Sequence, residues 1–130
     1  MINFLCLSTI VLAQEIDMGV FESNLPNRID VKIKPDFTVS GDLSFTTFVY
    51  TIRWADDEHS LSTSISPVYI APYNLQPFGA PQFHNGYFYQ RFYGINRPVG
   101  ATIMPGEERH IASFTYTGDE DVYFELINDD

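Results

Sequence analysis

Residues 45–57 read FTTFVYTIRWADD, and this stretch decides the fold class. Along its first part, large apolar side chains alternate with a second set that is half polar. Period two is the pattern of a β-strand, whose successive side chains point to opposite faces of a sheet. The apolar set is Phe48, Tyr50, Ile52 and Trp54. We therefore predict a central strand over Phe45–Trp54, with Trp54 in the core or at its rim rather than in a ligand platform.

The same alternation occurs before and after this stretch. In Arg28–Lys34 the apolar residues Ile29, Val31 and Ile33 point one way, and Pro35 follows the strand. Tyr87–Tyr93 follows Asn85-Gly86, a pair that tolerates positive φ and is typical of a two-residue hairpin turn. We expect its partner strand near Gln82–Phe83.

Period two also extends over Arg109–Thr117, where it predicts His110 and Ala112 on one face and Ile111 and Ser113 on the other. Val122–Ile127 is predicted as the last strand of this series. The shorter strand candidates are Met18–Glu22, Ser64–Ile70 and Val99–Ile103.

Apolar residues nowhere recur at helical spacing over more than two turns, and turn residues separate the runs. The prediction is an all-β domain, an antiparallel β-sandwich of about seven to nine strands. Residues 67–81 (PVYIAPYNLQPFGAP) contain four prolines, which lack the ladder donor. We expect this segment to form a long loop across one end of the sandwich.

The charge balance excludes one class of partner. The 130 residues contain 17 Asp and Glu against 7 Lys and Arg, for a net charge of −10. Nucleic-acid binding depends on clustered cations that neutralise phosphates, so this chain is not expected to bind nucleic acid.

Residues 1–13 (MINFLCLSTIVLA) are uncharged, and their apolar run from Phe4 to Leu12 is shorter than the roughly 20 residues of a membrane span. Small residues before Gln14 suit signal-peptidase cleavage, so we predict a signal peptide over 1–13, a domain over 14–130 and a secreted or cell-surface location. A buried first strand is the alternative. Cleavage would remove Cys6, the only cysteine, so disulfides are not expected. The closing FELINDD is an apolar strand that runs almost to the last residue, which predicts a longer polypeptide.

The order of several motifs resembles a known type of domain. These motifs are NRIDVKIKP (27–35), FTTFVYTIRW (45–54), GYFYQRFYG (86–94), MPGEERHI (104–111) and FELIND (124–129). Together they resemble the cohesin-like or carbohydrate-binding-module-like sandwich, of jelly-roll or cohesin type, that begins secreted surface proteins of Bacteroidota. The resemblance implies a non-catalytic module of a type IX secretion cargo protein, serving adhesion or protein–protein interaction.

Two acidic turns are candidate calcium sites, because Ca²⁺ prefers crowded oxygen ligands. One contains Asp56, Asp57 and Glu58, and the other contains Asp119 and Asp121. Neither has the alternating spacing of a calcium loop, so a solvated turn is the favoured interpretation and Ca²⁺ the alternative.

Catalytic motifs are weak throughout the sequence. The three histidines are far apart, and no Gly-x-Ser-x-Gly elbow marks a nucleophile. We predict that the chain is not an enzyme, and a glycoside-active domain is the remaining catalytic alternative.

Aromatic residues give the alternative binding function. Tyr69, Tyr73 and Phe78 lie in the proline-rich segment, and Tyr87 begins the hairpin arm. Exposed rings stack on sugars or anchor a protein partner, whereas buried rings only fill the sandwich. A carbohydrate-binding module is therefore the alternative to a protein-interaction module, with protein or polysaccharide as the partner.

Overall fold

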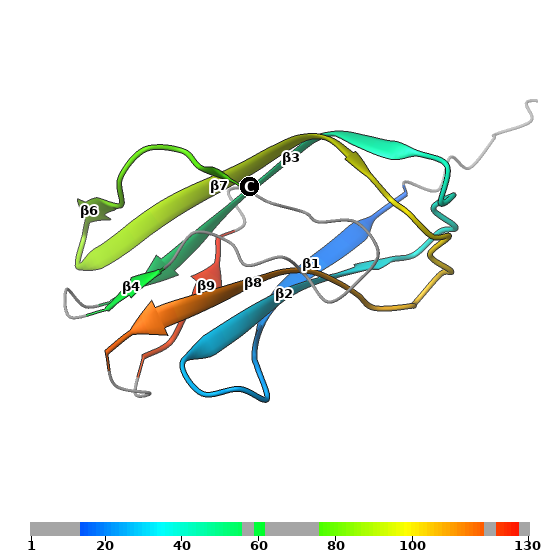
Figure 1. Ribbon diagram of the computed structural model, residues 1–130. Coiled ribbons are helices and arrows are strands. Elements are labelled where there is room, and N and C mark those ends of the chain that lie inside the picture. The colour runs from blue at the N-terminus through cyan, green and yellow to red at the C-terminus, as the bar shows by residue number, and fades with distance from the viewer. Residues whose placement is uncertain (1–13, 56–58, 62–75, 119–121, 128–130) are drawn as a thin grey trace, which may run out of the picture.

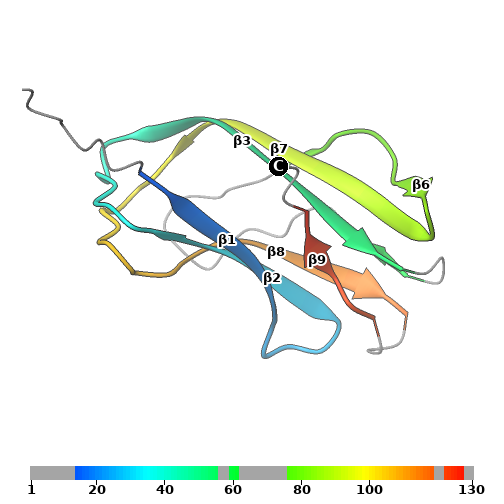
Figure 2. The ribbon, with the colours of Figure 1, turned by 180° about the vertical axis from the view of Figure 1, so that it is seen from behind.

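The computed structural model describes residues 14–55, 59–61, 76–118 and 122–127, apart from the Phe48 side chain. Within these ranges the chain forms nine strands and no helix. Figures 1 and 2 show two sheets stacked as a sandwich, one containing β3 and β7 and the other β1, β2 and β8. The predicted all-β antiparallel sandwich is confirmed.

The first layer is a four-stranded sheet in the order β1-β2-β8-β4. Its strands are β1 (Ile16–Glu22), β2 (Arg28–Pro35), β8 (Arg109–Thr117) and β4 (Ser60–Leu61). In β2 the alternation holds, because Ile29, Val31 and Ile33 are all buried.

The second layer is a five-stranded sheet in which β3 and β7 form the centre. Its strands are β3 (Ser44–Trp54), β7 (Tyr87–Pro98), β9 (Glu125–Leu126), β5 (Gln76–Pro77) and β6 (Gln82–His84). β5 and β6 pair with successive parts of the same edge of β7. The hairpin prediction is confirmed, since Asn85 (φ 49°) and Gly86 (φ 83°) connect β6 to β7.

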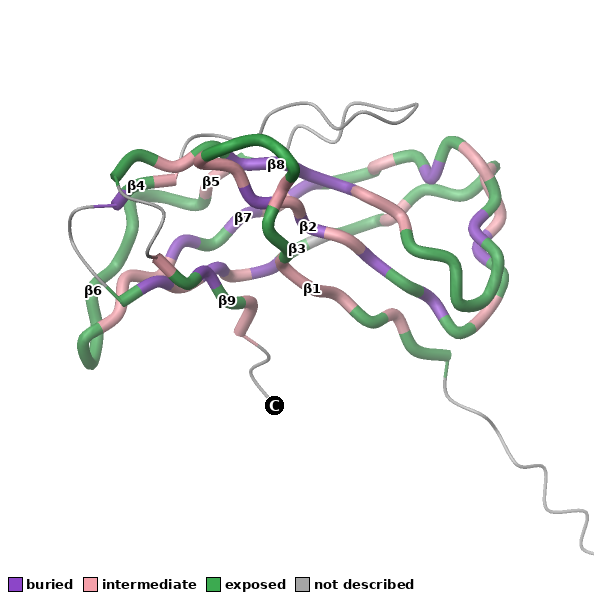
Figure 3. The backbone as a smooth tube through the Cα atoms, turned by 90° about the horizontal axis from the view of Figure 1, so that it is seen from below, coloured by how far each residue is buried: buried purple, intermediate pink, exposed green. Residues whose placement is uncertain are grey.

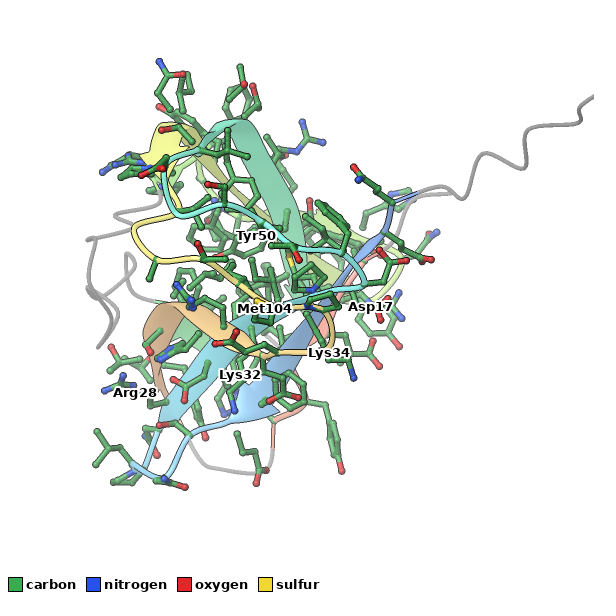
Figure 4. All side chains as sticks on the ribbon, turned by 90° about the vertical axis from the view of Figure 1, so that its right-hand side faces the viewer. Asp17, Arg28, Lys32, Lys34, Tyr50 and Met104 are labelled. Atoms are coloured by element: carbon green, nitrogen blue, oxygen red, sulfur yellow. The ribbon has the colours of Figure 1, made fainter. Side chains whose placement is uncertain are left out.

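The core lies between the sheets and is closed by large side chains from both. Trp54 is 1% exposed, and its ring stacks on Phe88 with centroids 5.9 Å apart. Its indole Nε1 donates a hydrogen bond to the His59 carbonyl at 3.1 Å, so the ring's polar atom is satisfied. Trp54 is thus a core residue. Figure 3 shows buried residues along β2, β8 and β7, and Figure 4 shows Tyr50 between the layers.

The alternation predicted for β8 is wrong. Val31 pairs with Ala112 but Lys32 pairs with His110, so a β-bulge at Ile111 inserts one extra residue. The bulge puts His110 and Ser113 on the same side of the sheet, while Ile111, Ala112 and Phe114 are all buried. A strictly alternating pattern of apolar and polar residues cannot predict such a bulge, because the extra residue shifts the alternation by one position.

Three smaller predictions also need correction. Only Glu125–Leu126 of the expected strand Val122–Ile127 is a strand, and Val99–Ile103 contributes one bridge, between Ile103 and Val39. The segment 67–81 is not entirely loop, because Gln76–Pro77 forms β5 at the sheet edge, where a missing proline donor is tolerated. The predicted strand Ser64–Ile70 lies outside the described residues.

Candidate functional site

Aromatic residues and arginines lie on the outer face of the five-stranded sheet. The other face of this sheet packs against the core. Along β7, the core residues Phe92 and Gln90 alternate with Tyr89, Arg91 and Tyr93, which point outward. Only one of these outward residues, Arg91, is charged.

Neighbouring strands bring further side chains beside them. Arg91 pairs with Thr51 of β3, and the Phe78 amide donates to the Arg91 carbonyl at 2.8 Å. The Ile127 amide donates to the Thr51 carbonyl at 3.1 Å. Phe78, Arg91, Thr51 and Ile127 therefore form one row across the sheet, assembled from four separate segments.

This row forms the base of a groove of about 570 Å³, which we call the sheet-face groove. The size is within the usual range for small-ligand sites, and the lining combines aromatic and apolar groups with a few polar ones. The lining residues are Thr51, Phe78, Gly79, Ala80, Gln82, His84, Tyr89, Arg91 and Ile127.

A buried side chain of β7 forms a hydrogen bond with the rim of the sheet-face groove. Gln90 is 5% exposed, and its side-chain amide donates to the Gly79 carbonyl at 3.0 Å. Gly79 itself has φ 73°, a conformation that glycine adopts without strain. The rim segment between β5 and β6 is thus hydrogen-bonded to β7.

The two arginines on this face have different surroundings. Arg53 Nε lies 2.8 Å from Glu125 Oε2, and its guanidinium stacks over Tyr87 at 4.4 Å. Hydrogen bonds to Glu125 and then Tyr89 raise the pKa of Arg53, so it stays charged. Arg91 lies over the Phe78 ring at 5.9 Å.

The predicted aromatic site is only partly described. Phe78 is 64% exposed and Tyr87 is half-buried, and both belong to this face. Their rings are inclined to their neighbours, at 80° between Phe78 and Tyr93 and 64° between Tyr87 and Tyr89. These rings line an uneven surface rather than one flat platform. Tyr69 and Tyr73 lie outside the described residues.

The predicted calcium ligands Asp56, Asp57, Glu58, Asp119 and Asp121 also lie outside the described residues. The described residues beside the two turns are paired, since Ser60 Oγ lies 2.8 Å from Thr117 Oγ1. Within the described ranges, no three His, Cys, Asp or Glu side chains are grouped as metal ligands. Calcium binding therefore stays a prediction of the sequence.

The bulge in β8 creates a polar cluster that the sequence did not indicate. Ser113 Oγ donates to Asp30 Oδ1 at 2.7 Å, accepts from Arg28 Nη2 at 2.7 Å and lies 2.7 Å from His110 Nε2. Serine, histidine and aspartate in contact are also the residue types of a hydrolytic triad.

The hydrogen bonding in this cluster does not suit nucleophilic catalysis. His110 Nε2 lies 2.9 Å from the Ala112 carbonyl, which only accepts, so this nitrogen carries a proton. It cannot then take the serine proton, and Ser113 is 0% exposed. The cluster instead satisfies buried polar groups of the four-stranded sheet.

Sequence reasoning missed most of the sheet-face groove. Of the residues that line the groove, only Phe78 was a predicted site residue. The alternation of Tyr87, Tyr89, Arg91 and Tyr93 with buried residues was the available signal. No sequence signal indicated that Thr51 and Ile127 line the groove, because neither segment shows by itself which strand it pairs with.

No protein-family model, curated protein or solved structure matches this chain. The described part of the chain contains no helix that is long and apolar enough to cross a bilayer.

Proposed function

We propose that this domain is a non-catalytic binding module of a secreted or cell-surface protein, and that it binds a polysaccharide chain in the sheet-face groove. The observation that carries the proposal is the exposed ring of Phe78 in a groove whose lining also contains Tyr89 and hydrogen-bonding side chains. Sugars present apolar ring faces and hydroxyl groups together, and this lining offers partners for both.

The test compares two matched phenylalanines. Phe78 is 64% exposed with Arg91 above its ring, and Phe21 is 43% exposed with Lys32 above its ring at 5.0 Å. They belong to the outer faces of different sheets. We expect Phe78→Ala to weaken binding about tenfold, because a central aromatic contact is worth more than 1 kcal/mol. Phe21→Ala should leave binding unchanged.

Binding is measured by affinity electrophoresis against a panel of neutral and acidic plant, algal and animal polysaccharides. Retention of the wild-type domain that Phe78→Ala weakens and Phe21→Ala does not is the expected result. If both variants are retained like the wild type, the groove is not the site. If the folded wild-type domain is retained by none of the panel, glycan binding itself is rejected.

A protein partner is the second candidate, and the edge of β1 favours it. β1 is seven residues long and lacks proline and lysine, whereas β4, β5 and β9 at the other described sheet ends have two residues each. The register with β2 directs the backbone groups of Ile16, Met18 and Val20 away from β2, on the side where no strand pairs with β1 among the described residues. A long unpaired edge is a template for an added strand.

Two substitutions at one position test this candidate. Met18→Ala and Met18→Pro both remove the side chain, but only proline removes the outward N–H. A partner bound along β1 should be retained by Met18→Ala and lost by Met18→Pro. Equal binding by both variants would exclude strand addition at this edge.

A further inference from the structure

The guanidinium of Arg91 has no carboxylate partner among the described residues. Three other arginines lie near one: Arg28 at 3.4 Å from Asp30, Arg53 at 2.8 Å from Glu125, and Arg109 at 3.9 Å from Glu107. Arg91 is exposed, and its guanidinium lies over the Phe78 ring, 5.9 Å from the ring centroid.

Arg91 therefore differs from Arg28, Arg53 and Arg109, each of which lies near a carboxylate. Acidic residues outnumber basic ones by 17 to 7, yet none of the described residues that line the sheet-face groove is Asp or Glu. The described lining thus combines the positive charge of Arg91 with aromatic and hydrogen-bonding side chains. Charge complementarity then calls for an anionic group on the ligand.

We propose that the sheet-face groove selects an acidic polysaccharide, with the carboxylate of a uronic acid residue bound by Arg91. This rests on the proposed function and names its substrate class. The planar guanidinium matches a carboxylate with two parallel hydrogen bonds, which are stronger than neutral ones. The Phe78 ring lies within cation–π range of the guanidinium, at 5.9 Å, on the same face of the groove.

The sheet face favours a sugar over an acidic peptide. Extended peptides bind largely through main-chain hydrogen bonds at a sheet edge. The groove lies on a face where β3, β5, β6 and β7 already use their backbone groups in the ladders. The available polar groups are the side chains of Thr51, Gln82 and His84, which suit hydroxyl groups.

The experiment uses polymers of galacturonate, glucuronate and mixed mannuronate–guluronate, each beside its carboxyl-reduced form. Reduction keeps the chain and removes the charge. Binding is measured by calorimetry at about 0.15 M salt, where charges beyond about 8 Å are screened. We expect at least one acid polymer to bind about tenfold more tightly than its reduced form.

Variants then assign the preference to Arg91. Arg91→Gln should abolish the difference between acid and reduced polymers, and Arg91→Lys should restore part of it. Lys32→Gln is the matched control, because Lys32 also lies over an exposed phenylalanine, on the other sheet. It should leave the preference unchanged, and all variants should unfold at the wild-type temperature.

The possible failures are distinct. Equal binding of acid and reduced polymers overturns the uronate proposal and leaves the proposed glycan function standing. An acid preference that Arg91→Gln retains also overturns it. Displacement of the bound polymer by hexaglutamate at equal affinity would assign the groove to acidic peptides. Absence of binding to every polymer, charged or neutral, rejects the proposed function as well.

Discussion

Tyr50 is the residue whose burial has the clearest consequence for stability. It is 6% exposed, lies between the sheets and packs on Phe92 with ring centroids 5.8 Å apart. Burial raises the pKa of its phenol well above the usual value near 10. The folded protein thus keeps this proton at a pH where the unfolded chain releases it.

The sign of the pH dependence follows from this shift. The stability that Tyr50 contributes is fully present below about pH 10 and is lost as the pH rises through the raised folded pKa. We expect a loss of about 1.4 kcal/mol per pH unit above pH 10 from this residue. The Tyr50→Phe variant should lack this pH-dependent loss of stability, whatever the other tyrosines contribute.

Urea unfolding at about pH 9 and about pH 11 measures the difference, because the slope with pH reports the protons released on unfolding. The wild-type free energy of unfolding should fall more steeply than that of Tyr50→Phe. Equal slopes for the two proteins would show that the Tyr50 phenol ionises in the folded state as it does in the unfolded chain.

At the scale of elements, the bulge in β8 brings Ser113 into a polar cluster, and the contribution of this cluster to stability can be tested. Ser113 exchanges hydrogen bonds with Arg28 and Asp30 from β2, which depend on the bulge for their geometry. Ser113→Ala removes one hydrogen bond each from Arg28 and Asp30 in this part-buried cluster, so it should destabilise the domain by about 1–3 kcal/mol. Thr47→Ala, at an exposed strand position, should change stability by less than about 0.5 kcal/mol.

Denaturant unfolding of both variants, with the slope compared as well as the midpoint, decides this prediction. Equal, small effects at Ser113 and Thr47 would mean that water replaces the serine hydroxyl at no cost.

Local pattern predicted the strands that run regularly and failed where pairing matters. In β2 and in the Tyr50–Trp54 part of β3 buried residues alternate regularly, so Ile33 and Ile52 were placed in the core correctly. The bulge at Ile111 depends on how β8 pairs with β2, which the segment itself does not contain. The hairpin turn was predictable, because Asn85-Gly86 encodes its conformation locally.

The candidate site was less predictable than the strands for the same reason. Phe78 was a candidate ligand contact with burial as the alternative, and its side chain is exposed. Thr51 and Ile127 reach the groove only through the pairing of β3 with the segment containing β9. A site built from four segments on one sheet face depends on strand order, which alternation alone does not determine.

At the scale of the whole molecule, the two outer faces differ in chemistry. The four-stranded sheet presents charged groups, and Figure 4 shows Asp17, Lys32 and Lys34 among them. The five-stranded sheet presents three outward tyrosines with Phe78, and its exposed apolar residues include Val49 and Ile95. Surfaces rich in aromatic residues and arginine and poor in acidic ones are typical of binding faces. The sandwich therefore has one outer face with many charged groups and one rich in aromatic residues, and we propose the second as the binding face.

The central claim is that this second face binds a polysaccharide in the sheet-face groove. Its most direct test is a titration of the isotope-labelled domain with uronate oligosaccharides and their carboxyl-reduced forms, followed by NMR chemical shifts. We predict that the largest changes fall at Thr51, Phe78, Tyr89 and Arg91. Changes concentrated along β1 or on the charged face, or no change with any oligosaccharide, would contradict it.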